Sequence, residues 1–136
     1  MNKLKLIAFY SGYLPGEKYG GPVVSLYNFT ELLGDDIDIY IVCLDHDLKE
    51  TTRYVEIHSG WNAVGKAQVQ YLSEHEFNRT SFDKIINEIS PNILYASSIF
   101  SATYILPLLT LTKRGNVPLL VAPRGELNDT ALKIKR

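Results

Sequence analysis

Short hydrophobic runs alternate along this chain with segments in which apolar residues recur at helical spacing. The runs with the length and the β-branched or aromatic content of strands are residues 4–10, 37–44, 67–72, 92–96 and 118–122. Alternation of strands with helices is typical of sheets whose strands run parallel. With right-handed crossovers, it predicts an α/β fold with a doubly wound, mostly parallel, Rossmann-like sheet in the strand order 3-2-1-4-5.

The helices are predicted between these runs. Residues 22–33 follow a Gly-Gly pair, begin with proline and carry an apolar stripe on one side. Residues 80–90 show the clearest helical spacing, and Thr80 is the expected N-cap, with an acidic residue three positions later. A further helix is expected over residues 101–114, and another begins at residues 130–136.

The segment between the second and third predicted strands is a polar loop. Trp61 lies in this loop, and we expect it to hold the loop against the domain. Residues 59–66 have room for a turn of helix. Residues 67–72 alternate between apolar and polar side chains, which is typical of an edge strand with one face in water.

Composition narrows the class of protein. The chain has 136 residues, 46% hydrophobic and 21% charged, so it can bury a core as one domain and is not disordered. Its formal net charge of −1 provides no overall electrostatic attraction to nucleic acid or to an anionic membrane. Cys43, the single cysteine, lies in an apolar run, which predicts a buried thiol in a reducing compartment. With neither a signal peptide nor a run long enough to span a membrane, the sequence predicts a cytoplasmic protein.

Gly20 and Gly21 stand directly before the first predicted helix. Free N–H groups and the positive end of the helix dipole emerge there, and glycines leave room for a ligand. Because the pair follows the first strand of an α/β sheet, where ligand crevices form, we predict that it receives an anion such as a phosphate. Lys18 and Tyr19 lie beside it. The alternative is turn chemistry without a ligand.

Two further loops are expected at the same edge of the sheet, because they leave the carboxyl ends of neighbouring strands. The loop at residues 97–101 supplies serine hydroxyls, whose simpler role is to cap the following helix. The other loop supplies Arg124, Gly125 and Glu126: a guanidinium fork for phosphate or carboxylate, a flexible glycine and a carboxylate. Arg124 and Glu126 could equally pair with other groups and fix the turn.

Other chemistries find less support. The histidines, His46, His58 and His75, are expected in loops away from this face and lack metal-ligand spacing, so no metal site is predicted. No nucleophile elbow, HExxH pattern or P-loop occurs, and the glycine pair lacks the third glycine of a dinucleotide fingerprint. Asp45 after the second strand keeps NAD binding open, since an acid there can bind a ribose. A stand-alone nucleotide- or phosphate-binding module without catalysis also stays open.

Two stretches of the sequence resemble bacterial glycosyltransferases of family 4. One is residues 10–26, which contain the paired glycines. The other is the sequence APRGEL at residues 122–127, followed by ALKIK at residues 131–135, and it is the more specific of the two. The similarity covers nearly the whole chain, including residues 61–62 and 92–95.

The resemblance implies a GT-B fold, in which two Rossmann-like domains face each other across the active site. Residues 1–136 would be the N-terminal, acceptor-side domain, truncated, without the C-terminal donor-binding domain. It implies a retaining, metal-independent hexosyltransferase of polysaccharide or lipopolysaccharide biosynthesis, without a cofactor. Such an enzyme moves a sugar from a nucleotide-sugar donor to a glycan or lipid-linked acceptor. A lipid-linked acceptor would bring it to the inner face of the membrane as a peripheral protein.

The same resemblance gives the candidate residues their roles. The glycine pair would lie near the donor diphosphate and the acceptor hydroxyl, and Arg124 and Glu126 would line the acceptor side of the cleft. The expected donor-phosphate and acceptor-binding residues are Lys18, Tyr19, Gly20, Gly21, Arg124, Gly125 and Glu126. Many members carry a histidine after the fourth strand, where this chain has Ser97 and Ser98. The paired glutamates of the family's donor-binding domain have no counterpart in this sequence, so we expect no sugar transfer by this chain alone.

Overall fold

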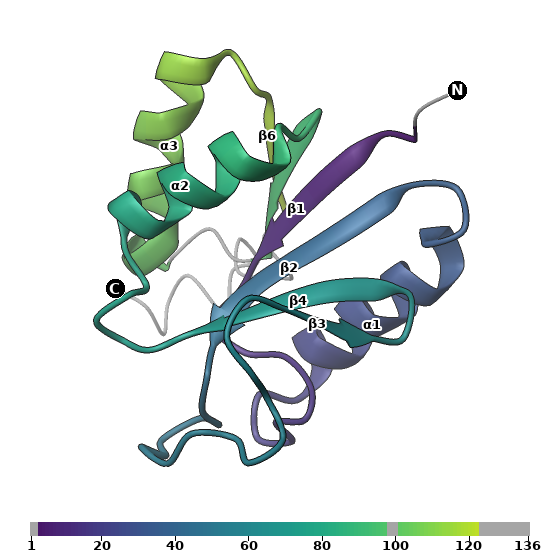
Figure 1. The fold of residues 1–136 in the computed structure, drawn as a ribbon, viewed down its shortest axis with the longest axis vertical. Coiled ribbons are helices and arrows are strands. Elements are labelled where there is room, and N and C mark those ends of the chain that lie inside the picture. The colour runs from purple at the N-terminus through teal and green to yellow at the C-terminus, as the bar shows by residue number, and fades with distance from the viewer. Residues whose placement is uncertain (1–2, 98–100, 123–136) are drawn as a thin grey trace, which may run out of the picture.

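The protein is described by a computed structural model over residues 3–97 and 101–122. Its elements are β1 (Lys5–Phe9), α1 (Gly21–Leu33), β2 (Asp38–Leu44), β3 (Trp61–Val64), β4 (Ala67–Leu72), α2 (Arg79–Ile89), β5 (Ile93–Ala96), α3 (Ala102–Gly115) and β6 (Leu119–Val121). Figure 1 shows the strands as one twisted sheet, with α1 on one face and α2 and α3 together on the other. The predicted α/β class is therefore confirmed.

The sheet has six strands in the order β3-β4-β2-β1-β5-β6. β1 pairs in parallel with β2 and β5, β2 pairs in parallel with β4, and β5 pairs in parallel with β6. β3, in contrast, pairs antiparallel with β4. The sheet is therefore mixed, and the predicted order 3-2-1-4-5 is corrected to this six-strand order. The correction arises at β3, a strand that the hydrophobic pattern does not reveal.

β3 forms because a two-residue turn folds it back onto β4. Val64 pairs with Ala67, so Gly65 and Lys66 make the turn, and Gly65 adopts a φ of 57°, which glycine tolerates without strain. Residues 59–66 thus contain a strand in place of the expected turn of helix. As a consequence β4 is an inner strand, and the prediction of an edge strand there is wrong.

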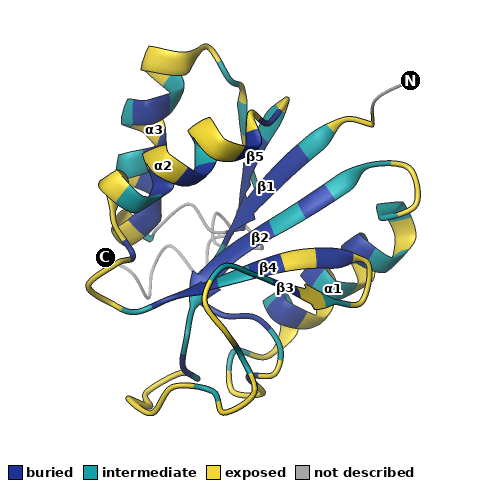
Figure 2. Ribbon diagram, viewed as in Figure 1, coloured by how far each residue is buried: buried dark blue, intermediate teal, exposed yellow. Residues whose placement is uncertain are grey.

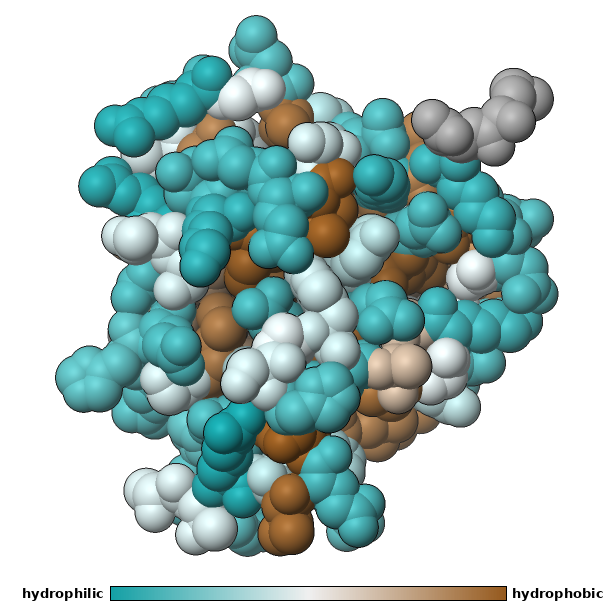
Figure 3. Space-filling view, viewed as in Figure 1, coloured by the Kyte–Doolittle hydropathy of each residue, from teal (hydrophilic) through white to brown (hydrophobic). Residues whose placement is uncertain are grey.

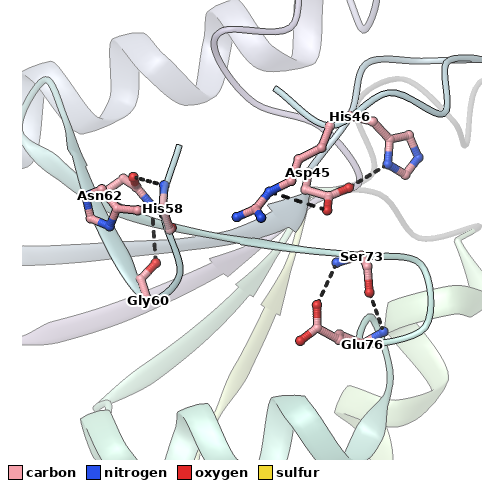
Figure 4. Close-up of polar contacts among 8 residues, drawn as sticks. Asp45, His46, His58, Gly60, Asn62, Ser73 and Glu76 are labelled. Atoms are coloured by element: carbon pink, nitrogen blue, oxygen red, sulfur yellow. Dashed lines mark hydrogen bonds and ion pairs between the residues drawn. The ribbon is translucent and has the colours of Figure 1, made fainter. Parts of the chain in front are cut away.

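Two neighbouring side chains fix β3 and the loop before it. Trp61 packs edge-on against Tyr40 of β2, with 5.1 Å between ring centroids, and donates its Nε1–H to Glu88 Oε1 of α2 at 3.3 Å. Trp61 therefore holds this segment against the domain, as predicted. Asn62 is buried, and its side chain bonds both backbone groups of His58, accepting from N at 3.1 Å and donating to O at 2.9 Å (Figure 4).

The sheet face under α1 forms one half of the core. Helix α1 buries Val23, Leu26 and Thr30, which belong to the stripe predicted from its spacing. The strand residues in the same cluster include Ala8, Ile39, Ile41, Cys43, Val69 and Tyr71. Cys43 is fully buried and forms no disulfide, and burial raises the pKa of its thiol. The prediction of a buried thiol is confirmed.

The opposite face of the sheet is covered by α2 and α3. The buried residues of these helices are Phe82, Ile85, Ile89, Tyr104, Ile105, Leu108 and Leu111. Phe82 lies edge-on to Phe9 of β1, with 5.0 Å between ring centroids, and to Phe77, with 5.1 Å. Figure 2 shows buried residues along the inner strands and on the sheet-facing sides of the helices. One sheet thus serves two hydrophobic cores.

The start of α2 differs from the prediction. Its N-cap is Asn78, which has an extended backbone and a side chain that accepts a hydrogen bond from Ser81 N at 3.0 Å. Thr80, the predicted N-cap, lies inside the first turn. Asparagine ranks above threonine as an N-cap, so the residue with the stronger preference takes the position.

Candidate functional site

A cavity of about 440 Å³ opens at the carboxyl ends of β1 and β2. It is lined by Tyr10, Ser11, Tyr19, Leu44, His46, Asp47, Leu48, Lys49, Glu50, Glu74, Ser101 and Tyr104. These residues come from the loops after β1, β2 and β4 and from the start of α3, which follows β5. β1 and β5 are neighbours, and the helices that follow them, α1 and α3, lie on opposite faces of the sheet (Figure 1). Ligands of open α/β sheets bind between two strands of this kind.

The carboxylate of Asp47 joins the loop after β1 to the loop after β2. It accepts the backbone N–H of Glu17 at 3.0 Å, of Lys18 at 3.2 Å and of Leu48 at 2.8 Å. Desolvation acts to raise the pKa of Asp47, but these backbone hydrogen bonds outweigh it and lower the pKa below its usual value. Asp47 is therefore ionised at neutral pH and fixes one rim of the cavity.

Lys18, expected beside the glycine pair as a ligand for an anion, has a protein partner. Its Nζ forms an ion pair with Glu50 Oε1, and its side chain is 56% exposed. The hydrogen bond and the charge of Glu50 raise the pKa of Lys18. Lys18 is not among the residues that line the cavity, and Glu50 balances its charge.

Tyr19 is half-buried in the wall of the cavity. Its ring packs edge-on against Tyr10, with 6.0 Å between centroids, and it covers Gly12 so closely that a Cβ there would come within 2.0 Å of the ring. Only glycine permits this approach without displacing the tyrosine. Burial raises the pKa of Tyr19 to about 12, so its hydroxyl stays protonated and can donate a hydrogen bond.

Gly20 and Gly21 stand at the start of α1. Gly20 is the N-cap, with a φ of 74° that favours glycine, and its carbonyl accepts a hydrogen bond from Val23 N at 3.2 Å. A Cβ at either glycine would meet nothing within 4 Å. Within the described part of the chain, no acceptor bonds the N–H of Gly21. The glycines do not line the cavity themselves but adjoin Tyr19, which does.

His46 lines the cavity with Tyr10 and Ser11, so the expectation that the histidines lie away from this face is wrong for His46. Its Nδ1 lies 2.8 Å from Asp45 Oδ1 (Figure 4), and its Nε2 lies 3.4 Å from Glu74 Oε1. The side chain of His46 is 10% exposed, that of Asp45 is 16% exposed and that of Glu74 is 79% exposed. The sequence did contain a signal for His46: it lies just beyond the end of a predicted parallel strand, and functional side chains are common at such positions.

Asp45 contacts other groups of the protein. In a dinucleotide site, by contrast, its carboxylate would be free to bind a ribose. Its Oδ1 faces His46, and its Oδ2 lies 4.0 Å from Arg53 Nε. Its backbone carbonyl accepts a hydrogen bond from Tyr54 N at 2.9 Å. A carboxylate at Nδ1 sets the orientation of an imidazole ring, so Asp45 directs Nε2 of His46 toward Glu74.

The other two predicted loops are described in part. Ser101 lines the cavity, and Ser97 is buried, with its N–H donating to the last carbonyl of β1 at 3.3 Å. The first and second loops therefore meet at one site. Ser98, Arg124, Gly125 and Glu126 lie outside the described residues.

A second cavity, of about 360 Å³, lies beside the β3–β4 hairpin. It is lined by Leu14, Pro15, Glu56, Ile57, His58, Asn62, Ala63, Val64 and Tyr71. The amide of Asn62 is bonded within its own loop, and the hydroxyl of Tyr71 donates to Leu14 O at 2.5 Å. Because these polar groups already have protein partners, we assign this cavity a structural origin.

The rest of the described surface offers fewer candidates. Figure 3 shows a face that is largely hydrophilic, with apolar residues in small patches. Within residues 3–97 and 101–122, no group of three or more His, Cys, Asp or Glu side chains could hold a metal ion. Over the same ranges, no helix has the length and apolar character needed to cross a membrane.

Comparison of the chain with protein-family models, with curated proteins and with solved structures finds no match. A functional assignment therefore depends on the residues of the cavity and on the sequence motifs around it.

Proposed function

We propose that this chain is the acceptor-side domain of a retaining, metal-independent glycosyltransferase of the GT-B type. The observation that carries the proposal is the cavity at the carboxyl ends of β1 and β2, which is lined by tyrosines, a histidine and carboxylates. The motifs at residues 10–26 and 122–127, which resemble family 4 glycosyltransferases, support it. In this proposal the enzyme transfers a sugar from a nucleotide-sugar donor to a glycan or lipid-linked acceptor at the cytoplasmic face of the membrane.

The chemistry of the cavity suits an acceptor alcohol. Sugar hydroxyls donate and accept hydrogen bonds, so they can bond both a carboxylate oxygen and an imidazole nitrogen. Tyrosine adds an apolar ring for the C–H surface of a sugar and a polar tip. Tyr10 and Tyr19 contribute rings to the cavity, and His46 and Glu74 contribute hydrogen-bonding groups. An alcohol held there is the nucleophile that glycosyl transfer requires.

The donor side of the proposal relies on the start of α1. Negative charge gathers on the diphosphate leaving group as the glycosidic bond breaks, and positioned N–H donors stabilise it. The N–H of Gly21 is open to such an oxygen, and the positive end of the helix dipole lies beside it.

A stand-alone phosphate- or nucleotide-binding module is the second candidate. The open helix start at Gly20 and Gly21 favours it, since that feature can bind an anion without help from the acceptor cavity. The two candidates differ in whether a sugar is transferred.

The decisive experiment is an assay of sugar transfer by the complete gene product. The complete protein, incubated with radiolabelled nucleotide-sugars and with glycan or lipid-linked acceptors, is expected to form a product that retains the anomeric configuration. Residues 1–136 alone are expected to form none. Binding of a nucleotide-sugar by the complete protein without transfer would favour the binding module, and no binding at all would contradict both candidates.

Gly21→Ala tests the donor side. The added methyl group meets no protein atom within 4 Å, so the fold is retained, but it adds bulk in the open space beside the start of α1. Turnover of the complete protein is expected to fall by about tenfold or more. Gly115→Ala is the matched control, because its methyl group also has room, 3.9 Å from Val117, at the far end of α3. Equal turnover of Gly21→Ala and the wild type would show that the start of α1 does not contribute to the donor site.

A further inference from the structure

The polar groups around His46 are suited to a hydroxyl ligand. Nδ1 of His46 lies 2.8 Å from Asp45 Oδ1, which leaves Nε2 as the ring nitrogen that a ligand can bond. Glu74 Oε1 lies 3.4 Å from that Nε2 and accepts hydrogen bonds. A hydroxyl group both donates and accepts, so two adjacent hydroxyl groups can bond the imidazole nitrogen and the carboxylate at about 2.8 Å each.

The imidazole of His46 and the carboxylate of Glu74 differ in how firmly they are held. The His46 side chain is 10% exposed and fixed by the largely buried carboxylate of Asp45. The Glu74 side chain is 79% exposed, so its carboxylate can adjust to a ligand at little cost. A fixed group beside an adjustable one suits a series of related sugars that present their hydroxyls at slightly different angles.

Aromatic rings lie in the same cavity. Tyr10 and Tyr19 form an edge-on pair with 6.0 Å between centroids, and both line the cavity. The apolar face of a sugar ring packs against such surfaces while its hydroxyls reach the polar wall. A small inorganic anion would leave these rings unused.

The charges of the cavity disfavour an anionic ligand. Asp47, Glu50 and Glu74 contribute carboxylates, and Lys49 is the one lysine among the lining residues. The ammonium group of Lys18, close by in sequence, is engaged by Glu50. A phosphorylated or carboxylated sugar would bring like charge toward these carboxylates.

From this arrangement we infer that the cavity binds the uncharged, polyhydroxylated end of a glycan, with one hydroxyl of a vicinal diol bonded to His46 Nε2 and the other to the Glu74 carboxylate. The inference rests on the proposed function for the reaction that the sugar undergoes. It adds the substrate class: a neutral sugar terminus, which excludes a sugar phosphate or a lipid diphosphate as the group bound in this cavity.

The experiment measures binding, so it needs no donor and no turnover. The 136-residue chain is titrated with methyl glycosides of glucose, galactose and mannose, with the corresponding 6-phosphates, and with deoxy sugars that lack one hydroxyl of the diol. Imidazole and backbone resonances are followed by NMR. Neutral glycosides are expected to shift the His46 signals, and the phosphates to bind at least about tenfold more weakly, as do the deoxy sugars.

Substitutions test the two hydrogen-bonding groups separately. His46→Phe keeps an aromatic ring but removes the nitrogen, and Glu74→Ala removes the carboxylate at an exposed position where folding does not depend on it. Each is expected to weaken glycoside binding by about tenfold. His75→Phe is the matched control, because His75 is exposed and does not line the cavity. Should His46→Phe fail to fold, Glu74→Ala and the deoxy sugars still decide the question.

The outcomes separate this inference from the proposed function. Binding of neutral glycosides at His46, combined with no sugar transfer by the complete protein, would support the inference and contradict the function. Transfer to a phosphorylated or lipid-diphosphate acceptor, with no competition from neutral glycosides, would support the function and overturn the inference. Shifts that are equal for neutral and phosphorylated sugars, or that are unchanged in Glu74→Ala, would also overturn it.

Discussion

At the scale of single residues, Asn62 shows how one buried amide holds a loop. Its Nδ2 donates to the carbonyl oxygens of His58 at 2.9 Å, Gly60 at 3.2 Å and Val69 at 3.4 Å, and its Oδ1 accepts from His58 N. Without this side chain the backbone groups lose partners in a region that is partly closed to water. A buried polar group without a hydrogen-bond partner lowers the stability of the fold by more than a single hydrogen bond adds to it.

Asn62→Ala is therefore expected to lower the free energy of unfolding by about 2 kcal/mol. Urea unfolding followed by circular dichroism measures the change. Asn87→Ala is the control, because Asn87 lies exposed on α2, and its loss is expected to stay within about 0.5 kcal/mol. Similar losses for both variants would show that the hydrogen bonds of Asn62 contribute nothing specific.

Single residues differ in how well the sequence predicts them. The burial of Cys43 and Val23 followed from apolar spacing, since a buried position is a property of the local pattern. The contact between His46 and Glu74 did not, because it joins the ends of two strands that are not consecutive in the chain. Its geometry depends on the course of both loops, which hydrophobic periodicity does not encode.

At the scale of elements, the types of the long segments were predictable, and their ends and one short strand were not. The spacing in residues 80–90 predicts α2 well, but Asn78 and Thr80 both have side chains that can cap a helix. β3 is four residues long and shows no clean alternation, so its pairing depends on the Gly65–Lys66 turn and on Trp61. Such tertiary support overrides weak local preference.

The N-cap of α2 can be tested directly. Asn78→Ala is expected to lower the free energy of unfolding by about 1 kcal/mol, because it removes the acceptor for Ser81 N. Thr80→Ala, inside the first turn and exposed, is expected to change it by less than about 0.5 kcal/mol. Thermal unfolding of both variants measures the difference. If Thr80→Ala lowered the free energy of unfolding more than Asn78→Ala, Thr80 would be the N-cap, as the sequence pattern predicts.

At the scale of the whole molecule, the alternation of strands and helices predicts the α/β class, because each helix needs a sheet face to cover. The strand order was corrected by β3, and the meeting of loops at the cavity depended on the three-dimensional course of the chain. Among those loops, the one after β1 is fastened by the carboxylate of Asp47, so ionisation of one side chain affects how the site is assembled.

Acid is expected to release this fastening. The backbone hydrogen bonds lower the pKa of Asp47 in the folded protein, and in the unfolded chain it returns to its usual value of about 3.9. Between the two values the unfolded state binds more protons, so the stability contributed by Asp47 is full above about pH 4 and is lost as pH falls through the folded pKa. Glu76, whose pKa is lowered first by the backbone N–H of Ser73, adds to the same acid sensitivity.

Asp47→Asn should therefore destabilise the protein by about 1 kcal/mol at pH 7 and by progressively less as the pH falls through the folded pKa of Asp47, because a protonated Asp47 loses its advantage over the amide. Urea unfolding of the wild type and the variant across this range measures the difference. Asn62→Ala serves as the control, since an amide does not titrate and its cost should persist in acid. A cost of Asp47→Asn that stays constant with pH would mean that the carboxylate's charge contributes nothing to holding the two loops at the rim of the cavity.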